Sequence, residues 1–307
     1  MTVAGLTKDE VVGIFPPLYT PFTTDGELDR DAFRADIDYQ LQFPVTGLVV
    51  GGSTGEGHAL DLGELIELTK IAVEHVNGRV PIMTGIITTT TREAVARAQG
   101  AKAVGARGVM VTPPIYQSAN FDGMIRFYGD IKEQGGLPVT IYNVLVHNPV
   151  TPEITRRLAE LGHIVATKES VGGSFATLSE LLDTVSDLIS VTWAQDHLLY
   201  PGLAMGATGS ISGTGAMFPA ESIAMLEAIK RNDFDEAQRI HFALAPLTRA
   251  VMNGKNWPAW VKAVAELQGR KVGPARRPFV PLTDTEIATL EAGLAVAQSA
   301  LAPALTR

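Results

Sequence analysis

The sequence predicts an α/β fold, a (β/α)8 TIM barrel followed by a small C-terminal helical region. Short apolar runs rich in Val, Ile and Thr alternate with longer segments of helical periodicity. Such continuous apolar runs are typical of strands buried on both faces of a parallel sheet. Eight strand–helix units in about 230 residues favour a closed barrel. A doubly wound sheet is the alternative, but it rarely needs eight units, and no G-x-G-x-x-G motif follows the first run.

Each element follows from a local pattern. The predicted strands are residues 11–22, 46–50, 80–84, 108–112, 137–142, 164–168, 189–193 and 208–212. The amphipathic helices predicted between and after them are residues 29–42, 62–76, 91–104, 121–134, 151–161, 175–185, 197–205 and 219–231. After Arg231 the strand-like runs stop, and residues 233–253, 257–268 and 284–299 predict helices. We therefore predict a catalytic barrel domain over 1–231 and an α-helical region over 232–307.

Composition excludes several classes of protein. The chain has 25 Lys and Arg against 33 Asp and Glu, a net charge of -8, which disfavours nucleic-acid binding because that needs clustered positive charge. It has no cysteine, which excludes disulfides, thiol nucleophiles and Cys-ligated metals. No apolar run approaches the ~20 residues of a membrane span, and the N-terminus lacks the apolar core of a secretory signal. We expect a cytoplasmic protein that binds neither nucleic acid nor membrane.

Lys168 is the first candidate for chemistry. It ends the sixth apolar run, and the ends of barrel strands face the active site. Partial desolvation there favours the neutral amine that attacks a carbonyl. A buried ion pair with Glu169 or Glu56 is the structural alternative. Strand-end lysines in barrels also bind phosphates or metals, so position alone leaves the role open.

Tyr142 and the Gly-rich turn at 51–56 are the other candidates. Tyr142 ends the fifth run, where a phenol can relay protons, although aromatic packing is the alternative. Backbone N–H groups of the turn, with the Ser53 and Thr54 hydroxyls, suit a carboxylate, although an ordinary turn is the alternative. Together with Lys168 these groups would hold a 2-oxo acid while its ketone condenses with the amine. The resulting iminium is an electron sink for C–C cleavage, condensation or β-elimination, without a metal or cofactor.

Three motifs occur in a characteristic order: Gly-Ser-Thr-Gly-Glu at 52–56, Tyr-Asn at 142–143 and Lys-Glu-Ser at 168–170. In order and context the chain resembles the dihydrodipicolinate synthase / N-acetylneuraminate lyase family of class I, Schiff-base-forming aldolases. The resemblance extends from residue 13 to residue 274.

The resemblance implies specific roles. Lys168 would form the Schiff base with pyruvate or a related 2-oxo acid, and no other cofactor and no metal would be needed. Tyr142 would be the proton shuttle, in hydrogen-bond contact with Thr54, and Ser53 and Thr54 would hold the carboxylate. The backbone of Ile211 would line the Schiff-base pocket. The family also implies a homotetramer built as a dimer of dimers.

Two positions depart from the synthase pattern. His147 stands where the synthases carry an Arg that binds the second substrate's carboxylate, and losing a bidentate Arg weakens dicarboxylate binding. Ile115 stands at the position of a relay Tyr, and Tyr116 follows one residue later. A polyol or other non-dicarboxylate tail would suit the neutral or mixed side chains predicted nearby. They are Gln117, Asn143, His147, Asn148, Asp196 and His197, with His58 as a further candidate.

The sequence therefore predicts a Schiff-base lyase or aldolase acting on a pyruvate-type 2-oxo acid. One alternative is a 2-keto-3-deoxy-acid dehydratase or deaminase that uses the same lysine. The others are 4-hydroxy-tetrahydrodipicolinate synthase activity and a non-catalytic relative that binds a 2-oxo acid. Retention of Lys168, Tyr142, Ser53 and Thr54 argues against the last, because a pure binder needs no proton shuttle.

Overall fold

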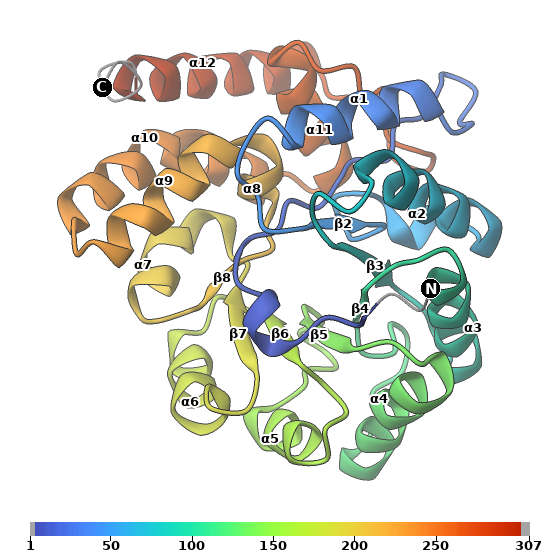
Figure 1. The fold of residues 1–307 in the computed structure, drawn as a ribbon. Coiled ribbons are helices and arrows are strands. Elements are labelled where there is room, and N and C mark those ends of the chain that lie inside the picture. Colours follow the sequence, from blue (N-terminus) through green and yellow to red (C-terminus); the bar gives the residue numbers. More distant parts are fainter. Residues whose placement is uncertain (1–3, 302–307) are drawn as a thin grey trace.

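Eight parallel strands form the centre of the structure, a computed structural model that describes residues 4–301 (Figure 1). Their order is β1-β8-β7-β6-β5-β4-β3-β2, and the ring closes where Pro17 pairs in parallel with Val49. This confirms the predicted (β/α)8 barrel. The strands are β1 (Gly13–Ile14), β2 (Leu48–Val50), β3 (Ile82–Ile86), β4 (Gly108–Val111), β5 (Val139–Asn143), β6 (Ala166–Glu169), β7 (Ser190–Trp193) and β8 (Gly209–Ser210).

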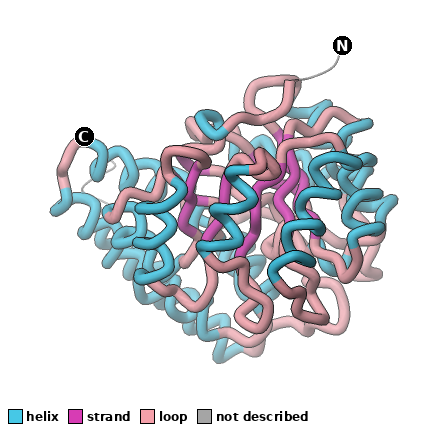
Figure 2. The backbone as a smooth tube through the Cα atoms, turned by 90° about the horizontal axis from the view of Figure 1, so that it is seen from below, coloured by secondary structure: helices cyan, strands magenta, loops and turns pink. Residues whose placement is uncertain are grey.

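Helices surround the strands, as the side view in Figure 2 shows. The first five of the barrel helices follow a Thr, Asn or Asp whose side chain accepts a hydrogen bond from the first turn, such as Thr90 before α3. The helices of the barrel are α1 (Arg30–Gln40), α2 (Leu62–Val76), α3 (Thr91–Ala103), α4 (Phe121–Gly135), α5 (Pro152–Glu160), α6 (Phe175–Val185), α7 (Leu199–Ala204), α8 (Gly213–Met217) and α9 (Pro219–Lys230).

The first strand and the last unit of the barrel differ from expectation. The predicted strand over 11–22 contracts to β1 because Pro16, Pro17 and Pro21 have no N–H to donate to a neighbouring strand. The short helix α8 lies directly after β8 and was not predicted. It begins at Gly213 and is capped by Ser212, whose hydroxyl accepts from the Gly215 N–H.

The inside of the barrel is a packed core. Side chains from β2, β3 and β4 meet there, among them Val49, Met83 and Met110. Leu6 and Val11 join the same cluster from the segment before β1. Between them the short helix η1 (Lys8–Glu10), blue in Figure 1, crosses the middle of the ring. The N-terminal segment therefore covers one end of the barrel, and the chemistry is left to the end where the strands finish.

The C-terminal region packs against the barrel. It consists of α10 (Phe234–Asn253), α11 (Trp257–Leu267) and α12 (Asp284–Leu301), and α10 lies beside α12 (Figure 1). Its apolar side chains share one continuous hydrophobic cluster with β4, β5 and β7 and the helices around them. Three buried or half-buried ion pairs add polar links to the turn after β2 and to α1 and α2. They are Lys262–Glu56, Arg270–Asp36 and Arg276–Glu64.

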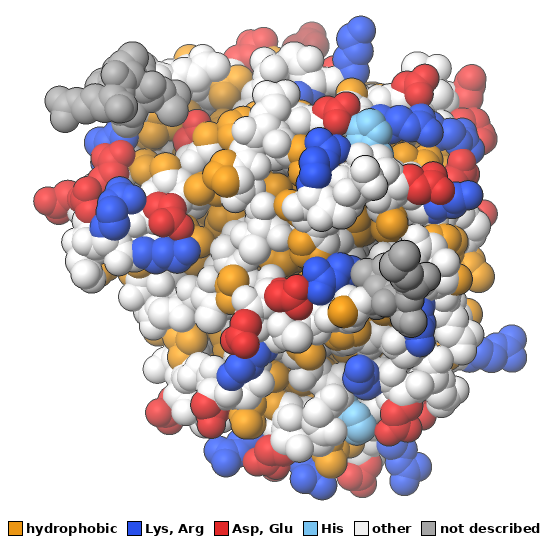
Figure 3. All heavy atoms as spheres, viewed as in Figure 1, with side chains coloured by type: hydrophobic (Ala, Val, Ile, Leu, Met, Phe, Trp, Pro, Cys, Tyr) orange, Lys and Arg blue, Asp and Glu red, His pale blue; other side chains and the backbone are white. Residues whose placement is uncertain are grey.

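The surface is charged but mixed. On the face shown in Figure 3, acidic and basic side chains are interspersed. Over residues 4–301, no helix is both long enough and apolar enough to cross a bilayer.

Candidate active site

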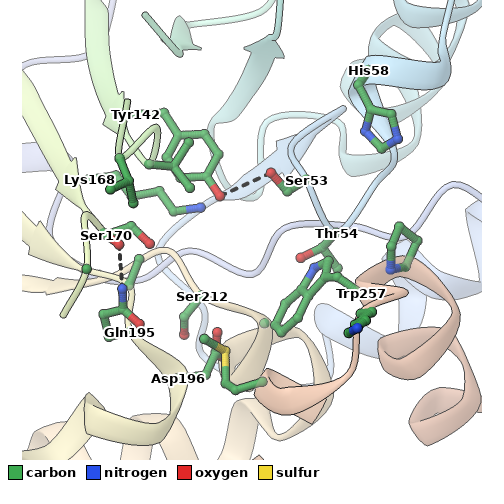
Figure 4. A pocket seen from close by; sticks show the side chains of 18 of the residues that line it. Ser53, Thr54, His58, Tyr142, Lys168, Ser170, Gln195, Asp196, Ser212 and Trp257 are labelled. Atoms are coloured by element: carbon green, nitrogen blue, oxygen red, sulfur yellow. Dashed lines mark hydrogen bonds between the residues drawn. The ribbon is translucent and has the colours of Figure 1, made fainter. Parts of the chain in front are cut away.

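A cavity of about 500 Å³ lies where the strands end. It is lined by residues from the ends of β5 and β6, from the segments that follow β2, β7 and β8, and from the C-terminal region (Figure 4). Its polar lining residues are Ser53, Thr54, His58, Tyr142, Lys168, Ser170, Gln195, Asp196, Ser212 and Lys255.

Lys168 and Tyr142 lie side by side in this cavity. They are register partners on the paired strands β5 and β6, so both side chains project to the same face. The Lys168 Nζ lies 3.6 Å from the centre of the Tyr142 ring, and each residue is only 5% exposed. The Tyr142 hydroxyl is 3.1 Å from the Ser53 Oγ (Figure 4). An amine, a phenol and a hydroxyl thus form one connected chain.

Asn143 and Glu169 follow them on the same two strands and point to the opposite face. The Asn143 amide donates to the Glu169 carboxylate at 2.8 Å, and it exchanges two hydrogen bonds with the backbone of Val150. Glu169 also accepts from the Val171 N–H at 2.8 Å. Burial raises the pKa of Glu169 to about 7, partly offset by these hydrogen bonds. Asn143 is therefore committed to holding the ends of the strands together and does not line the cavity.

Neither acid considered as a partner for Lys168 pairs with it. Glu169 faces away, and Glu56 lies 2.6 Å from the Nζ of Lys262. Within residues 4–301, no carboxylate lies within ion-pair distance of the Lys168 ammonium group. Lys168 is thus a buried amine held against an aromatic ring and open to the cavity.

The turn after β2 places two hydroxyls in the cavity. Gly51 opens it with φ at +70°, a left-handed conformation that favours glycine. At Gly57, a Cβ atom would lie 1.8 Å from the Gly51 carbonyl oxygen, so the turn closes on itself too tightly for a side chain. Ser53 and Thr54 both line the cavity. The hydroxyl that bonds to Tyr142 is that of Ser53, where the resemblance implied Thr54.

Asp196 lines the cavity below Lys168 in Figure 4. It begins the short helix η3 (Asp196–Leu198) after β7. Its Oδ1 accepts from both the N–H and the hydroxyl of Thr214, the latter at 2.6 Å. Burial raises the pKa of the Asp196 carboxyl, while the bonds from Thr214 and the charge of Lys168 lower it. Asp196 is thus a buried acid whose proton affinity depends on the charge of the neighbouring amine.

Several predicted residues lie elsewhere. Ile211 is fully buried in the barrel core, next to the lining residue Ser212. The His147 ring is exposed and its Nε2 lies 3.2 Å from the Ile115 carbonyl oxygen. Tyr116 is 78% exposed. The structure also places Gln117, Asn148 and His197 outside the cavity lining.

His58 does line the cavity. Its ring contacts Phe279 edge to face, with the ring centres 5.7 Å apart. Burial lowers the pKa of His58, and the nearby Glu56 carboxylate raises it. The neutral ring is therefore favoured near neutral pH.

Sequence reasoning missed the contribution of the C-terminal region to this cavity. Met252, Lys255, Trp257, Pro258 and Phe279 all line it. Trp257 and Pro258 read only as the start of a helix, and nothing local indicates a position more than 80 residues from Lys168 in the chain but beside the same cavity. In the described part of the chain, no group of three or more His, Asp or Glu side chains is arranged to hold a metal ion.

Comparison with known proteins gives one consistent result. Residues 10–297 match the model of the Dihydrodipicolinate synthetase family. The 4-hydroxy-tetrahydrodipicolinate synthase of Pelobacter propionicus is 36% identical over 280 residues, 91% of this chain and 96% of the relative. That of Methanospirillum hungatei is 36% identical over 273 residues, 87% of this chain and 92% of the relative.

Solved structures agree. The 4-hydroxy-tetrahydrodipicolinate synthase of Methylacidiphilum fumariolicum superposes with a TM-score of 0.90 at 29% identity, covering 95% of this chain and 98% of that one. YagE of E. coli K12, a prophage protein of the dihydrodipicolinic acid synthase family solved with pyruvate, gives 0.89 at 30% identity, covering 94% and 99%.

Proposed function

This chain belongs to the dihydrodipicolinate synthetase family, as the motifs predicted, and we propose that Lys168 is the amine that forms its Schiff base. The protein is a lyase of the class I aldolase type that acts on a pyruvate-type 2-oxo acid. That assignment sets aside the non-catalytic alternative. The observation that carries our proposal is the buried Lys168 amine, 3.6 Å from the Tyr142 ring and beside an open cavity.

The reaction follows from the chemistry of an amine and a ketone. Lys168 Nζ adds to the ketone carbon of the 2-oxo acid, and loss of water leaves a protonated imine. A proton then leaves C3, giving an enamine. In the synthetic direction, C3 bonds to the carbonyl carbon of an aldehyde, whose oxygen takes a proton. Water finally hydrolyses the imine and frees Lys168; cleavage runs the same steps in reverse.

The hydroxyls near Lys168 can transfer protons and bind the substrate carboxylate, which the amine alone does not do. The Tyr142 phenol lies against the amine and is bonded to Ser53, so it can deliver and remove the protons of these steps. The turn carrying Ser53 and Thr54 offers hydroxyls to the substrate carboxylate. No further cofactor enters this scheme, because the imine itself is the electron sink.

Elimination is a second candidate, supported by Asp196. This buried carboxyl lines the cavity, and burial favours its protonated form. A protonated carboxyl can give its proton to a hydroxyl on C4, the carbon next to C3 of the enamine. The C4–O bond then breaks, water leaves, and the enamine electrons form a double bond between C3 and C4 as the imine is restored at C2. A panel of 2-oxo acids assayed for pyruvate release against a dehydrated product separates the two reactions.

The relatives are named 4-hydroxy-tetrahydrodipicolinate synthases, but the position of His147 does not support that activity in this chain. The imidazole is directed at the Ile115 carbonyl and does not line the cavity. It offers no equivalent of a bidentate guanidinium for a dicarboxylate. We therefore do not extend that activity to this chain.

Borohydride trapping tests the lysine. We expect pyruvate and borohydride to give a reduced adduct on the peptide that contains Lys168, and none on those that contain Lys255 or Lys262, which serve as internal controls. Lys168→Ala is expected to abolish both the adduct and turnover, whereas Lys230→Ala, on the exposed end of α9, changes neither. An unmodified Lys168, or an active Lys168→Ala variant, refutes the proposal.

We propose that the chain self-associates, as the family resemblance implies. Val146 and Tyr116 are exposed apolar side chains on the loops after β5 and β4, at 72% and 78%. Hydrogen bonds between these loops, from Asn148 to the Pro114 carbonyl and from Ser118 to the His147 carbonyl, make them one surface. We propose that this surface contributes to a homotetramer, which light scattering tests. One structural relative is described as a monomeric variant, so the oligomeric state varies among related folds.

A cytoplasmic location stays a prediction.

A further inference from the structure

Much of the cavity beyond Lys168 is apolar. Its lining includes Val144, Val146, Met252, Trp257, Pro258 and Phe279. Two of these come from the loop after β5 and four from the C-terminal region. We propose that this wall binds an aldehyde acceptor with a flat apolar tail, such as an aromatic aldehyde. This deepens the proposed function and rests on it, because the acceptor would be attacked by the Lys168 enamine.

Two of the polar groups that line the cavity, Gln195 and Asp196, are partly engaged by hydrogen bonds within the protein. The Gln195 amide donates to the Ser170 carbonyl, and the Asp196 Oδ1 accepts twice from Thr214. These bonds reduce the number of partners left for a hydroxylated tail, which disfavours it relative to an apolar tail.

Trp257 is the central feature of the apolar wall. In Figure 4 its indole lies across the cavity from Lys168 and close to Ser212. The ring packs directly on the start of α8, since a Cβ atom added at Gly213 would lie 2.8 Å from the indole Cζ2. A glycine there lets the indole approach the backbone closely, so the ring is packed on one side against the start of α8. A fixed indole is a surface on which a flat apolar group packs favourably.

Lys255 would favour a different acceptor, one that carries a negative charge. Apart from Lys168 it is the only Lys or Arg that lines the cavity in the described part of the chain, and its side chain is exposed. An acceptor that ends in a carboxylate would use this ammonium group. An ammonium in water gains little from such a pair, whereas burial of an apolar tail against Trp257 and Phe279 gains in proportion to the area covered.

The step conserves atoms. C3 of the enamine bonds to the carbonyl carbon of the aromatic aldehyde, and the aldehyde oxygen takes one proton. After hydrolysis the product is a 4-hydroxy-2-oxo acid with the aromatic group on C4. In reverse, the same enzyme releases pyruvate and the aldehyde.

Acceptor preference tests the proposal directly. We would measure kcat/KM with pyruvate and benzaldehyde, glyceraldehyde or succinic semialdehyde, representing an aromatic, a hydroxylated and an anionic acceptor. We expect benzaldehyde to be preferred by roughly 10-fold or more, the discrimination that an apolar pocket provides. A preference for glyceraldehyde or the semialdehyde overturns the proposal. Failure of the Schiff base itself is distinguished by the absence of a borohydride adduct with pyruvate alone.

Two variants locate the preference. Trp257→Ala is expected to lower kcat/KM for benzaldehyde roughly 10-fold, and Trp257→Phe to recover most of it. Phe242→Ala removes an aromatic ring that is 63% exposed on α10 and is expected to change nothing. If Trp257→Ala is unfolded by circular dichroism, Trp257→Leu replaces it, because leucine keeps an apolar side chain but removes the flat ring; it is expected to lower kcat/KM for benzaldehyde more than for glyceraldehyde, and an equal effect on both contradicts the proposal. If Lys255→Gln lowers kcat/KM for benzaldehyde more than either Trp257 variant does, the proposal that the apolar wall binds the acceptor is contradicted.

Discussion

Tyr142 serves two separable roles. Its ring lies under the Lys168 ammonium at 3.6 Å, and its hydroxyl bonds to Ser53 at 3.1 Å. The aromatic face stabilises a cation at the Lys168 Nζ. The hydrogen bond to Ser53 places the phenol in a chain through which a proton can be transferred. Phenylalanine retains the first and removes the second.

We therefore expect Tyr142→Phe to lower kcat by roughly 100- to 10,000-fold while the protein remains folded, because the buried ring keeps its packing. Steady-state kinetics with pyruvate and the preferred acceptor aldehyde measures the loss of kcat. Thermal unfolding is the control for folding. Ser53→Ala removes only the hydroxyl to which the phenol is bonded, and its effect should be smaller. A Tyr142→Phe enzyme with the wild-type kcat contradicts a proton-transfer role for the phenol.

Glu169 should make stability depend on pH in an unusual direction. Burial raises its pKa to about 7 from the usual 4.5. Between those values the native state holds a proton that the unfolded chain has lost, so the free energy of unfolding falls as pH rises. The penalty is absent below pH 4.5, is complete above about pH 7, and is on the order of 3 kcal/mol.

Urea unfolding at pH 5, 6, 7 and 8 measures this trend. Glu169→Gln removes the titration but keeps an oxygen for the Val171 N–H, and it changes the bond from Asn143. We expect the fall in stability between pH 5 and pH 8 to be smaller in this variant than in the wild type. Equal slopes would mean that other groups set the pH dependence.

At the scale of elements, the sequence predicted what local patterns encode. Seven apolar runs mark the positions of β2 to β8, because a doubly buried strand needs a continuous apolar run. Lys168 and Tyr142 could be identified as site residues because polar side chains at the ends of such runs are conspicuous. β1 is shorter than predicted because prolines interrupt its run, and the five residues of α8 are too few for helical periodicity to be recognised.

The far side of the cavity could not be predicted, for a physical reason. Asn143 occupies a motif next to Tyr142, but the alternation of side chains along β5 directs it to the opposite face. Trp257 and Phe279 reach the cavity only because α11 and the loop after it fold back over the barrel. That approach depends on long-range packing and ion pairs, which leave no local pattern.

The Lys262–Glu56 pair connects α11 to the turn that carries Ser53 and Thr54. Glu56 is fully buried in a left-handed conformation, its carboxylate lies 2.6 Å from the Lys262 Nζ, and it also accepts from the Arg276 N–H at 2.8 Å. Burial lowers the pKa of Lys262, and the Glu56 carboxylate raises it. The pair therefore holds the shape of the turn from outside the barrel.

Lys262→Met leaves a buried, unpaired carboxylate and is expected to cost about 3 kcal/mol of unfolding free energy and to raise the KM for the 2-oxo acid. The double variant Glu56→Gln/Lys262→Met should recover part of the stability, because it removes the uncompensated charge. Urea unfolding of the two single variants and the double variant gives the coupling energy. Additive effects would show that the two groups act independently.

At the scale of the whole molecule, the barrel and the C-terminal region share one hydrophobic cluster. Residues of α10, α11 and α12 such as Leu247, Val261 and Leu290 belong to the same hydrophobic cluster as the strands. The boundary predicted at 231/232 falls between α9 and α10, where the chain turns back to cover the barrel. A boundary between elements is thus not a boundary between independently packed cores, and this difference is testable.

We expect a fragment of residues 1–231 not to fold on its own. Removing α10 to α12 exposes the apolar surface of the barrel to water, leaves Glu56 and Asp36 buried without their partners, and deletes one wall of the cavity. Size-exclusion chromatography should show aggregates, and urea unfolding should lack a cooperative transition. Adding residues 232–307 as a separate chain should restore solubility if the shared core is what is missing. A monodisperse, cooperatively unfolding fragment would instead establish 1–231 as a self-sufficient domain, with the C-terminal region needed only to complete the cavity.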